Sequence, residues 1–138
     1  MLTPLKFDQV DLCARLDALG SADLDALEFG VIGIDAATVV RLYNAFESQR
    51  AGIAPSRMLD RPLFTVAAPC MNNYLVAQRF ADALAANVAL DVTLDYVLTA
   101  QMRPVKVRLR LLAAPGAARR YVAVQWAADR VATPALPL

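Results

Sequence analysis

Leu90-Asp-Val-Thr-Leu-Asp-Tyr-Val-Leu98 and Val105-Lys-Val-Arg-Leu-Arg-Leu111 place apolar residues at every second position. This period is typical of β-strands that bury one face and expose the other. Pro115-Gly116 follows as a turn signal, and residues 121–128 form a further β-rich run. The C-terminal part of the chain therefore predicts three strands with one packed face and one solvent-facing face.

Two β-rich runs farther upstream predict a hairpin. The runs are Phe29–Asp35 and Val39–Tyr43, and Ala36-Ala37-Thr38 joins them. Asn44 follows directly and is a favourable N-cap residue. A short helix is therefore expected over residues 44–50.

Two short helices are expected before this hairpin. The first covers residues 8–19 and ends at Gly20, and Ser21 caps the second, which runs to Leu27. Cys13 is interpreted as a small apolar side chain within the packing of the first helix. Apolar residues three positions apart are expected on the packed face of that helix, namely Val10, Cys13, Leu16 and Leu19.

A longer connector helix is expected over residues 75–86, packed against the sheet. Its apolar residues fall at i, i+4, i+7 and i+8, namely Val76, Phe80, Ala83 and Leu84. Because Pro69 disfavours a helical predecessor, residues 64–68 are expected to be extended. Cys70, between that proline and the helical pattern, is expected near a helix N-terminus, where positive potential favours the thiolate.

Length and charge exclude several classes of protein. The 138 residues correspond to one domain with its own core. The net charge is +1 and the basic residues are spread along the chain, so no nucleic-acid surface is expected. No apolar run approaches the ~20 residues of a membrane helix, and no secretory signal is readable. A soluble, cytoplasmic protein without membrane association is therefore expected.

The chain contains no histidine and two cysteines. Ser-His-Asp and Cys-His catalytic arrangements are therefore excluded, as are the usual zinc sites, so no metal is expected. Gly30-Val-Ile-Gly33 lacks the third glycine of a phosphate-binding loop. No disulfide can be deduced from two cysteines. The sequence leaves an enzymatic function open and favours a non-enzymatic one.

Four short motifs follow one another at a specific spacing. Tyr43-Asn-Ala-Phe-Glu47 precedes Val66-Ala-Ala-Pro-Cys70, and Tyr96 and Gln101-Met-Arg-Pro104 lie downstream. In this order and spacing, from about Asp23 to Trp126, the chain resembles the photoactive yellow protein family. Members of that family are small bacterial blue-light receptors of the PAS fold.

The resemblance implies an α+β architecture. A PAS fold has a five-stranded antiparallel sheet with short helices and a connector helix on one face. In this family a helical cap precedes it. The expected organisation is an N-terminal helical cap over residues 1–28, a PAS domain over 29–130 and a loose tail over 131–138.

The same resemblance implies a chromophore and a mechanism. Cys70 would carry p-coumaric acid (4-hydroxycinnamic acid) as a thioester, and Tyr43 and a protonated Glu47 would donate hydrogen bonds to its buried phenolate. Burial raises the pKa of such a carboxyl and keeps it protonated. Light would isomerise the double bond, Glu47 would give up its proton, and the N-terminal helices would unfold as the signal. Met102 matches a methionine that assists recovery in the dark.

Several expected pocket positions differ from the family pattern, and each carries a smaller or more aliphatic residue. Ile53 stands where the family has an arginine over the chromophore ring. Tyr96 lies on the packed face of its strand. The remaining replacements are Ala51 for threonine, Leu63 and Leu98 for aromatic residues, and Ala100 for tyrosine. The pocket is therefore expected to be more aliphatic and to lack the shielding cation.

Two other readings remain open. In one, the chain is a chromophore-free PAS module that binds a protein partner or forms a homodimer. In the other, it is a small enzyme or carrier in which Cys70 holds an acyl group or another small ligand, with Glu47 or Tyr43 as acid or base. Under each of these hypotheses the chain binds a small molecule or a protein. Any signal is expected to pass to a separate downstream signalling protein.

Overall fold

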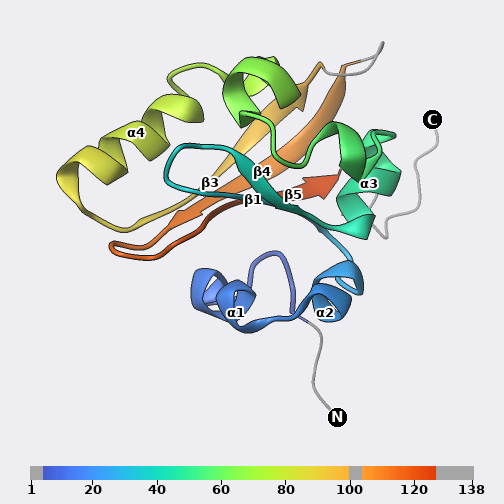
Figure 1. The fold of residues 1–138 in the computed structure, drawn as a ribbon, viewed down its shortest axis with the longest axis horizontal. Coiled ribbons are helices and arrows are strands. Elements are labelled where there is room, and N and C mark those ends of the chain that lie inside the picture. Colours follow the sequence, from blue (N-terminus) through green and yellow to red (C-terminus); the bar gives the residue numbers. More distant parts are fainter. Residues whose placement is uncertain (1–4, 100–103, 127–138) are drawn as a thin grey trace.

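The computed structural model describes residues 5–99 and 104–126. A five-stranded antiparallel sheet runs through its centre in the order β2-β1-β5-β4-β3, which confirms the predicted sheet (Figure 1). The expected tail over residues 131–138, together with Ala100 and Met102, lies outside the described residues. The strands are β1 (Gly30–Ile34), β2 (Val40–Tyr43), β3 (Leu90–Leu98), β4 (Val105–Ala113) and β5 (Arg120–Trp126).

The predicted alternation of buried and exposed residues is confirmed along β3, whereas β4 and β5 are buried on both faces for most of their length. Along β3, the apolar residues from Leu90 to Tyr96 are half-buried and the residues between them are exposed. β3 and β4 pair without a register shift from Leu90 opposite Ala113 to Leu98 opposite Val105. Between β4 and β5, Gly116 adopts φ +77°, a conformation that favours glycine, so the predicted turn forms there.

One face of the sheet carries the larger core. It is covered by α3 (Ala45–Ala51), by the turns η1 (Pro55–Arg57), η2 (Leu63–Ala67) and η3 (Pro69–Met71), and by α4 (Ala77–Ala86) (Figure 1). The expected helix after Asn44 and the connector helix are thereby confirmed. Their buried side chains join those of the sheet in one cluster that includes Val76, Phe80, Leu109 and Val122.

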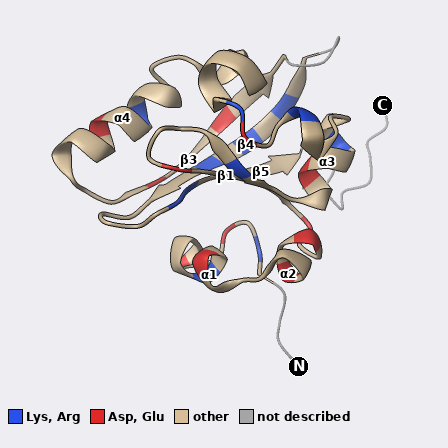
Figure 2. Ribbon diagram, in the orientation of Figure 1, with Lys and Arg blue, Asp and Glu red and all other residues tan. Residues whose placement is uncertain are grey.

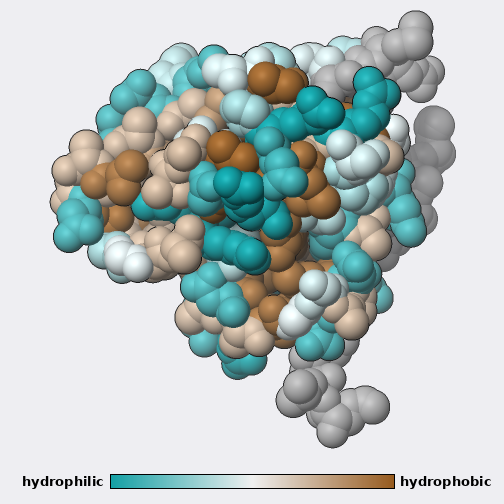
Figure 3. All heavy atoms as spheres, in the orientation of Figure 1, coloured by the Kyte–Doolittle hydropathy of each residue, from teal (hydrophilic) through white to brown (hydrophobic). Residues whose placement is uncertain are grey.

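The opposite face is covered by α1 (Leu12–Ala18) and α2 (Ser21–Asp25), which form the predicted N-terminal helical cap (Figure 1). Apolar atoms are visible where these helices meet the rest of the molecule (Figure 3). The prediction of a solvent-facing side is therefore wrong for most of the sheet, because the cap buries it. The buried residues of this second cluster are Phe7, Leu12, Leu16, Leu24, Leu27, Phe29, Val31, Leu112, Tyr121 and Ala123.

The predicted extended segment at residues 64–68 is wrong. Leu63–Ala67 forms a single π-helical turn, closed by a 2.7 Å hydrogen bond from the Ala68 nitrogen to the Leu63 oxygen. Proline restricts only the residue immediately before it, and Ala68 is indeed non-helical, with φ −143° and ψ 69°. The residues farther upstream are free to turn.

Three details of the predicted helices are also wrong. Val10 is 80% exposed because α1 begins only at Leu12, and Leu12 with Leu16 forms its buried face. Leu84 is 51% exposed, so the buried stripe at α4 consists of Val76, Phe80 and Ala83 alone. Gly20, not Ser21, occupies the N-cap of α2.

Charges of both signs are interspersed along the described chain (Figure 2). Within residues 5–99 and 104–126, no helix has the length and hydrophobicity needed to cross a bilayer. Among the same residues, no cluster of acidic or cysteine side chains is suited to hold a metal ion.

Candidate functional site

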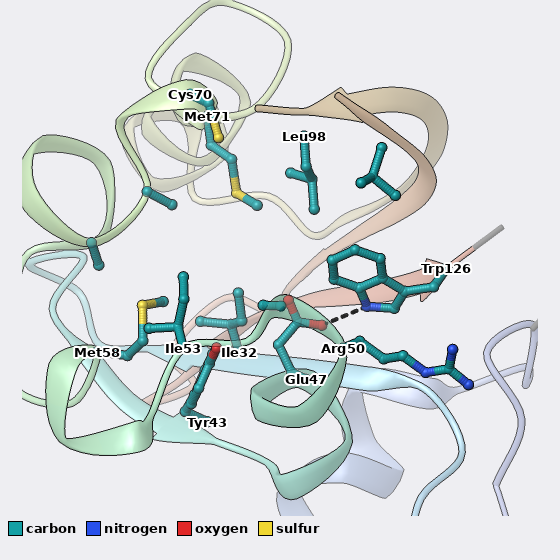
Figure 4. Close-up of a pocket in the computed structure, with 14 residues that line it drawn as sticks. Ile32, Tyr43, Glu47, Arg50, Ile53, Met58, Cys70, Met71, Leu98 and Trp126 are labelled. Carbon is teal, nitrogen blue, oxygen red and sulfur yellow. Dashed lines mark hydrogen bonds between the residues drawn. The ribbon is translucent and has the colours of Figure 1, made fainter. Parts of the chain in front are cut away.

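A cavity of about 60 Å³ lies in the larger core, between the inner face of the sheet and the segments that cover it (Figure 4). Its walls are mainly apolar, with a few polar groups, and in this lining, though not in its volume, it is like a small-molecule site. The lining residues are Ile32, Tyr43, Glu47, Arg50, Ala51, Ile53, Met58, Ala67, Ala68, Cys70, Met71, Leu98, Val105 and Trp126.

Local structure brings Tyr43 and Glu47 together. Tyr43 is the last residue of β2, and Asn44 then caps α3 by accepting a 3.1 Å hydrogen bond from the Glu47 nitrogen. This cap places Glu47 in the first helical turn after the strand. Both side chains consequently lie at the same end of the cavity, away from Cys70 (Figure 4).

The Glu47 side chain is enclosed, with only 3% of its residue surface exposed. Its Oε1 accepts a 2.9 Å hydrogen bond from Trp126 Nε1. Burial raises the pKa of Glu47 to about 8, and the hydrogen bond from Trp126 offsets part of that rise. The carboxyl group is therefore mainly protonated at neutral pH, so it can donate a hydrogen bond.

The Tyr43 hydroxyl is the second buried donor. Within the described part of the chain, it has no hydrogen-bond partner. Burial, and secondarily the neighbouring Glu47, raises its pKa well above the usual value. A buried hydroxyl without a partner is unfavourable for folding. The neutral phenol points into the cavity (Figure 4), where an acceptor on a ligand would satisfy it.

Cys70 lies in the short turn η3 at the other end of the cavity, as a half-buried free thiol. Cys70 is thus in the first turn of a short 3₁₀ helix, as expected of a helix N-terminus, but not of an α-helix, since the next α-helix begins only at Ala77. The Tyr96 hydroxyl donates a 2.5 Å hydrogen bond to the Cys70 carbonyl, and Asn73 Nδ2 donates to the Tyr96 oxygen at 2.6 Å. These bonds hold the backbone that carries the thiol.

The other predicted site residues divide into three groups. Ile53, Ala51 and Leu98 line the cavity. Leu63 is fully buried in the surrounding core but does not line the cavity, and Tyr96 acts only through the Cys70 backbone. Met102 lies outside the described residues, so its predicted role stays a prediction.

Arg50 is a cation on the cavity wall that sequence reasoning did not include. Its guanidinium carbon lies 5.0 Å from the centre of the Phe46 ring, a cation–π distance. In Figure 4 its side chain extends away from Tyr43 and Cys70. The chain therefore has a cation near the site, although it is not at Ile53, where the family pattern has one.

Sequence reasoning also missed Trp126 and Gly30, which both contact Glu47. A β-carbon at position 30 would fall 1.9 Å from Glu47 Oε1, so only glycine leaves room for the carboxyl group there. A glycine inside a strand indicates close approach of another group, and that signal was available in the sequence. Nothing in the sequence pairs Trp126 with Glu47, because their contact depends on the sheet order.

A comparison with protein-family models finds no match. Photoactive yellow protein from Rhodothalassium salexigens is 32% identical over 107 residues, which span 78% of this chain and 85% of that relative. Photoactive yellow protein from Halochromatium salexigens is also 32% identical, over 105 residues that span 76% of this chain and 83% of the relative.

Solved structures are similar along most of the chain. The photoactive yellow protein domain of the sensor histidine kinase Ppr from Rhodospirillum centenum is 36% identical, with a TM-score of 0.74, covering 81% of this chain and 97% of that domain. The PAS domain of an HTR-like protein from Haloarcula marismortui has a TM-score of 0.59 at 16% identity, covering 84% of this chain and 97% of that domain. These similarities confirm the predicted PAS fold.

Proposed function

The chain belongs to the photoactive yellow protein family, and from this membership we propose that it is a blue-light receptor carrying p-coumaric acid as a thioester on Cys70. The observation that carries the proposal is a pair of buried donors opposite that thiol. These are the unpartnered Tyr43 hydroxyl and the protonated Glu47 carboxyl.

The residues of the cavity fit such a group. A 4-hydroxycinnamoyl thioester needs a thiol at one end, apolar walls beside its ring and hydrogen-bond donors at its phenolate oxygen. Cys70 supplies the thiol, and Ile32 and Leu98 are among the apolar walls. A buried phenolate is unfavourable unless donors reach it, and Tyr43 with Glu47 provides two.

When bound, this group supplies absorption of blue light and a double bond that light isomerises from trans to cis. The proton chemistry belongs to the chain. Glu47 holds a proton that it can give up toward the phenolate end of the cavity. Loss of that proton leaves a buried carboxylate, which destabilises a fold by several kcal/mol. Since small domains are stable by only about 5–15 kcal/mol, part of the structure is expected to rearrange.

Asn44 connects the helix of Glu47 to the N-terminal cap. Its Oδ1 accepts from the Glu47 nitrogen at 3.1 Å and from the Val31 nitrogen at 2.9 Å. Its Nδ2 donates to the carbonyl oxygens of Leu24 and Phe29 at 2.9 and 3.1 Å. A change in the first turn of α3 therefore reaches the cap through one side chain. We expect release of the cap, residues 1–28, as the response.

Cap release would uncover apolar surface on the outer face of β1, β4 and β5. We propose that a separate signalling protein reads this change. The sheet residues that the cap covers are Val31, Leu112, Tyr121 and Ala123.

The test is reconstitution of the purified protein with an activated p-coumaric acid derivative, followed by intact mass and visible absorption. We expect one adduct, which Cys70→Ala abolishes and Cys13→Ala retains. Cys13 is the matched control because burial raises its pKa to about 11, which keeps it an unreactive thiol. The absorption band should lie to the red of the free thioester and bleach reversibly in blue light.

The other outcomes favour different functions. An adduct that survives in Cys70→Ala, or one with an unshifted band, would contradict a chromophore held in the cavity. Absence of any adduct would favour a chromophore-free interaction module. Turnover of an acyl thioester that depends on Cys70 would favour the enzyme or carrier.

A further inference from the structure

We propose that Trp126 is a positioning residue for Glu47: it fixes Oε1 as the acceptor and directs the proton on Oε2 into the cavity. This role for Glu47 as a donor in the cavity rests on the proposed function. Trp126 itself would act only through the carboxyl group.

Two elements of the sheet hold the same oxygen of Glu47. Trp126, at the end of β5, donates from Nε1 to Oε1 at 2.9 Å. On β1, the missing side chain of Gly30 makes the space that Oε1 occupies, since a β-carbon there would lie 1.9 Å away. The other carboxyl oxygen points into the cavity (Figure 4). The two oxygens therefore have different surroundings.

The chemistry of indole favours one oxygen of Glu47 over the other as the site of the proton. An indole N–H can donate a hydrogen bond but cannot accept one. Oε1 is therefore the acceptor, and because a carbonyl oxygen accepts a hydrogen bond better than a hydroxyl oxygen does, this bond favours the form of the protonated carboxyl group with the hydrogen on Oε2. That oxygen is the one directed at a ligand. Trp126 thus orients the donor as well as the side chain.

The same hydrogen bond favours loss of the proton. When Glu47 becomes a carboxylate, the bond from Trp126 becomes charge-assisted and stronger. Trp126 would then stabilise the buried anion that proton release creates. Without this bond, Glu47 would hold its proton more tightly.

Other ionisable groups also face the cavity. Among the described residues they are Tyr43 from β2, Arg50 from α3 and Cys70 from η3. The hydrogen bond of the Trp126 indole goes to Glu47. A titration seen at the Trp126 indole can therefore be assigned to Glu47 by substitution.

The sequence makes the test unusually direct, because Trp126 is the single tryptophan and Glu28 and Glu47 are the two glutamates. The experiment uses the full chain without chromophore, labelled with ¹³C at the glutamate carboxyl carbons and ¹⁵N at the indole. We expect the indole N–H signal and the Glu47 carboxyl signal to titrate with the same midpoint. In Glu47→Gln the indole titration should disappear, and in Glu28→Gln it should persist.

Trp126→Phe keeps an aromatic ring and removes the donor. In this variant we expect the titration midpoint of Glu47 to rise by roughly one pH unit, which corresponds to an about tenfold higher proton affinity. An unchanged or lowered midpoint would overturn the proposal, as would an indole signal in the unmodified chain that does not follow Glu47. The second result needs no variant, so a misfolded Trp126→Phe does not prevent a decision.

Failure of this test can be separated from failure of the proposed function. Coupled titration in a chain that forms no adduct on Cys70 would support Trp126 and refute the photoreceptor. An adduct with a red-shifted band in a chain without coupled titration would support the photoreceptor and refute the role of Trp126.

Discussion

On the cap side of the sheet, the buried Arg110 guanidinium donates to four oxygen atoms: both carboxylate oxygens of Asp91 and the carbonyls of Phe7 and Gln9. On the cavity side, the buried Tyr43 hydroxyl has no partner among the described residues. The tyrosine of the cap side, Tyr121, donates to Asp17 at 2.5 Å. Two buried tyrosines thus differ in what completes their hydrogen bonding.

This difference distinguishes the face of the sheet that holds the N-terminal cap from the face that holds the cavity. Arg110 and Tyr121 join the sheet to the N-terminal helices, so their bonds stabilise the docked cap. Tyr43 and Glu47 stand beside free volume, and a ligand would complete their bonding. The other buried side-chain atoms without a partner in the described chain, Arg79 Nε and Arg120 Nη1, also belong to the larger-core side, near α4.

The largest expected effect is on the cavity side of the sheet, where Glu47 should make the free energy of unfolding depend on pH. Glu47 has an ordinary pKa of 4.5, which burial raises to about 8 in the fold. Between these values the unfolded chain releases the proton and the folded chain keeps it, so the free energy of unfolding falls as pH rises. The fall should be on the order of 4 kcal/mol between pH 4.5 and 8.

Urea unfolding at pH 5 to 9 measures this fall. Glu47→Gln should remove most of the slope, and Glu28→Gln, at an exposed position, should retain it. Equal slopes in the original chain and Glu47→Gln would mean that Glu47 is not held protonated by the cavity.

A smaller effect is expected from the cap side. Arg110→Ala removes four hydrogen bonds and leaves two carbonyl groups of the N-terminal segment without a donor. We expect a loss of about 2–3 kcal/mol, reduced from that of a fully buried pair because the Asp91 side chain is 52% exposed. Chemical denaturation gives this value, and amide exchange should increase in α1 and α2.

Arg15→Ala is the matched control for Arg110→Ala. It breaks an ion pair with Asp11 in which both side chains are more than half exposed, so we expect a change below about 0.5 kcal/mol. Similar losses in the two variants would contradict the role assigned to Arg110.

The smallest effects should come from the two tyrosines, and they compare the faces most closely. Tyr121→Phe removes a satisfied hydrogen bond and should lower stability by about 1 kcal/mol. Tyr43→Phe removes an unpartnered hydroxyl from the chromophore-free chain and should leave stability unchanged or raise it slightly. Thermal or urea unfolding of both variants is sufficient. A loss in Tyr43→Phe as large as that in Tyr121→Phe would show that the Tyr43 hydroxyl is already satisfied.

Much of the fold could be predicted from local patterns. The alternation in β3, the turn at Gly116 and the cap at Asn44 all depend on near neighbours in the chain, and the structure has them. The π-helical turn at Leu63–Ala67 could not be predicted from Pro69, which constrains only Ala68. Exposure of Val10 and Leu84 depends on where each helix begins and how it packs, which helical spacing does not determine.

The site was predictable only in part, for a related reason. Tyr43 is the last residue of β2, and Glu47 lies in the first turn of the helix that follows. Their proximity therefore follows from the sequence. Trp126 reaches Glu47 only because β5 lies next to β1 in the sheet, an arrangement that no local pattern encodes.

The most direct test of the account is the visible absorption of the Cys70 adduct at neutral pH, measured in the folded chain and again after unfolding in urea at the same pH. If Tyr43 and Glu47 stabilise a buried phenolate, the folded chain will have a red-shifted band that moves to the position of the neutral phenol on unfolding. An identical band in both states would contradict the account, because it would mean that the two donors do not reach the phenolate end.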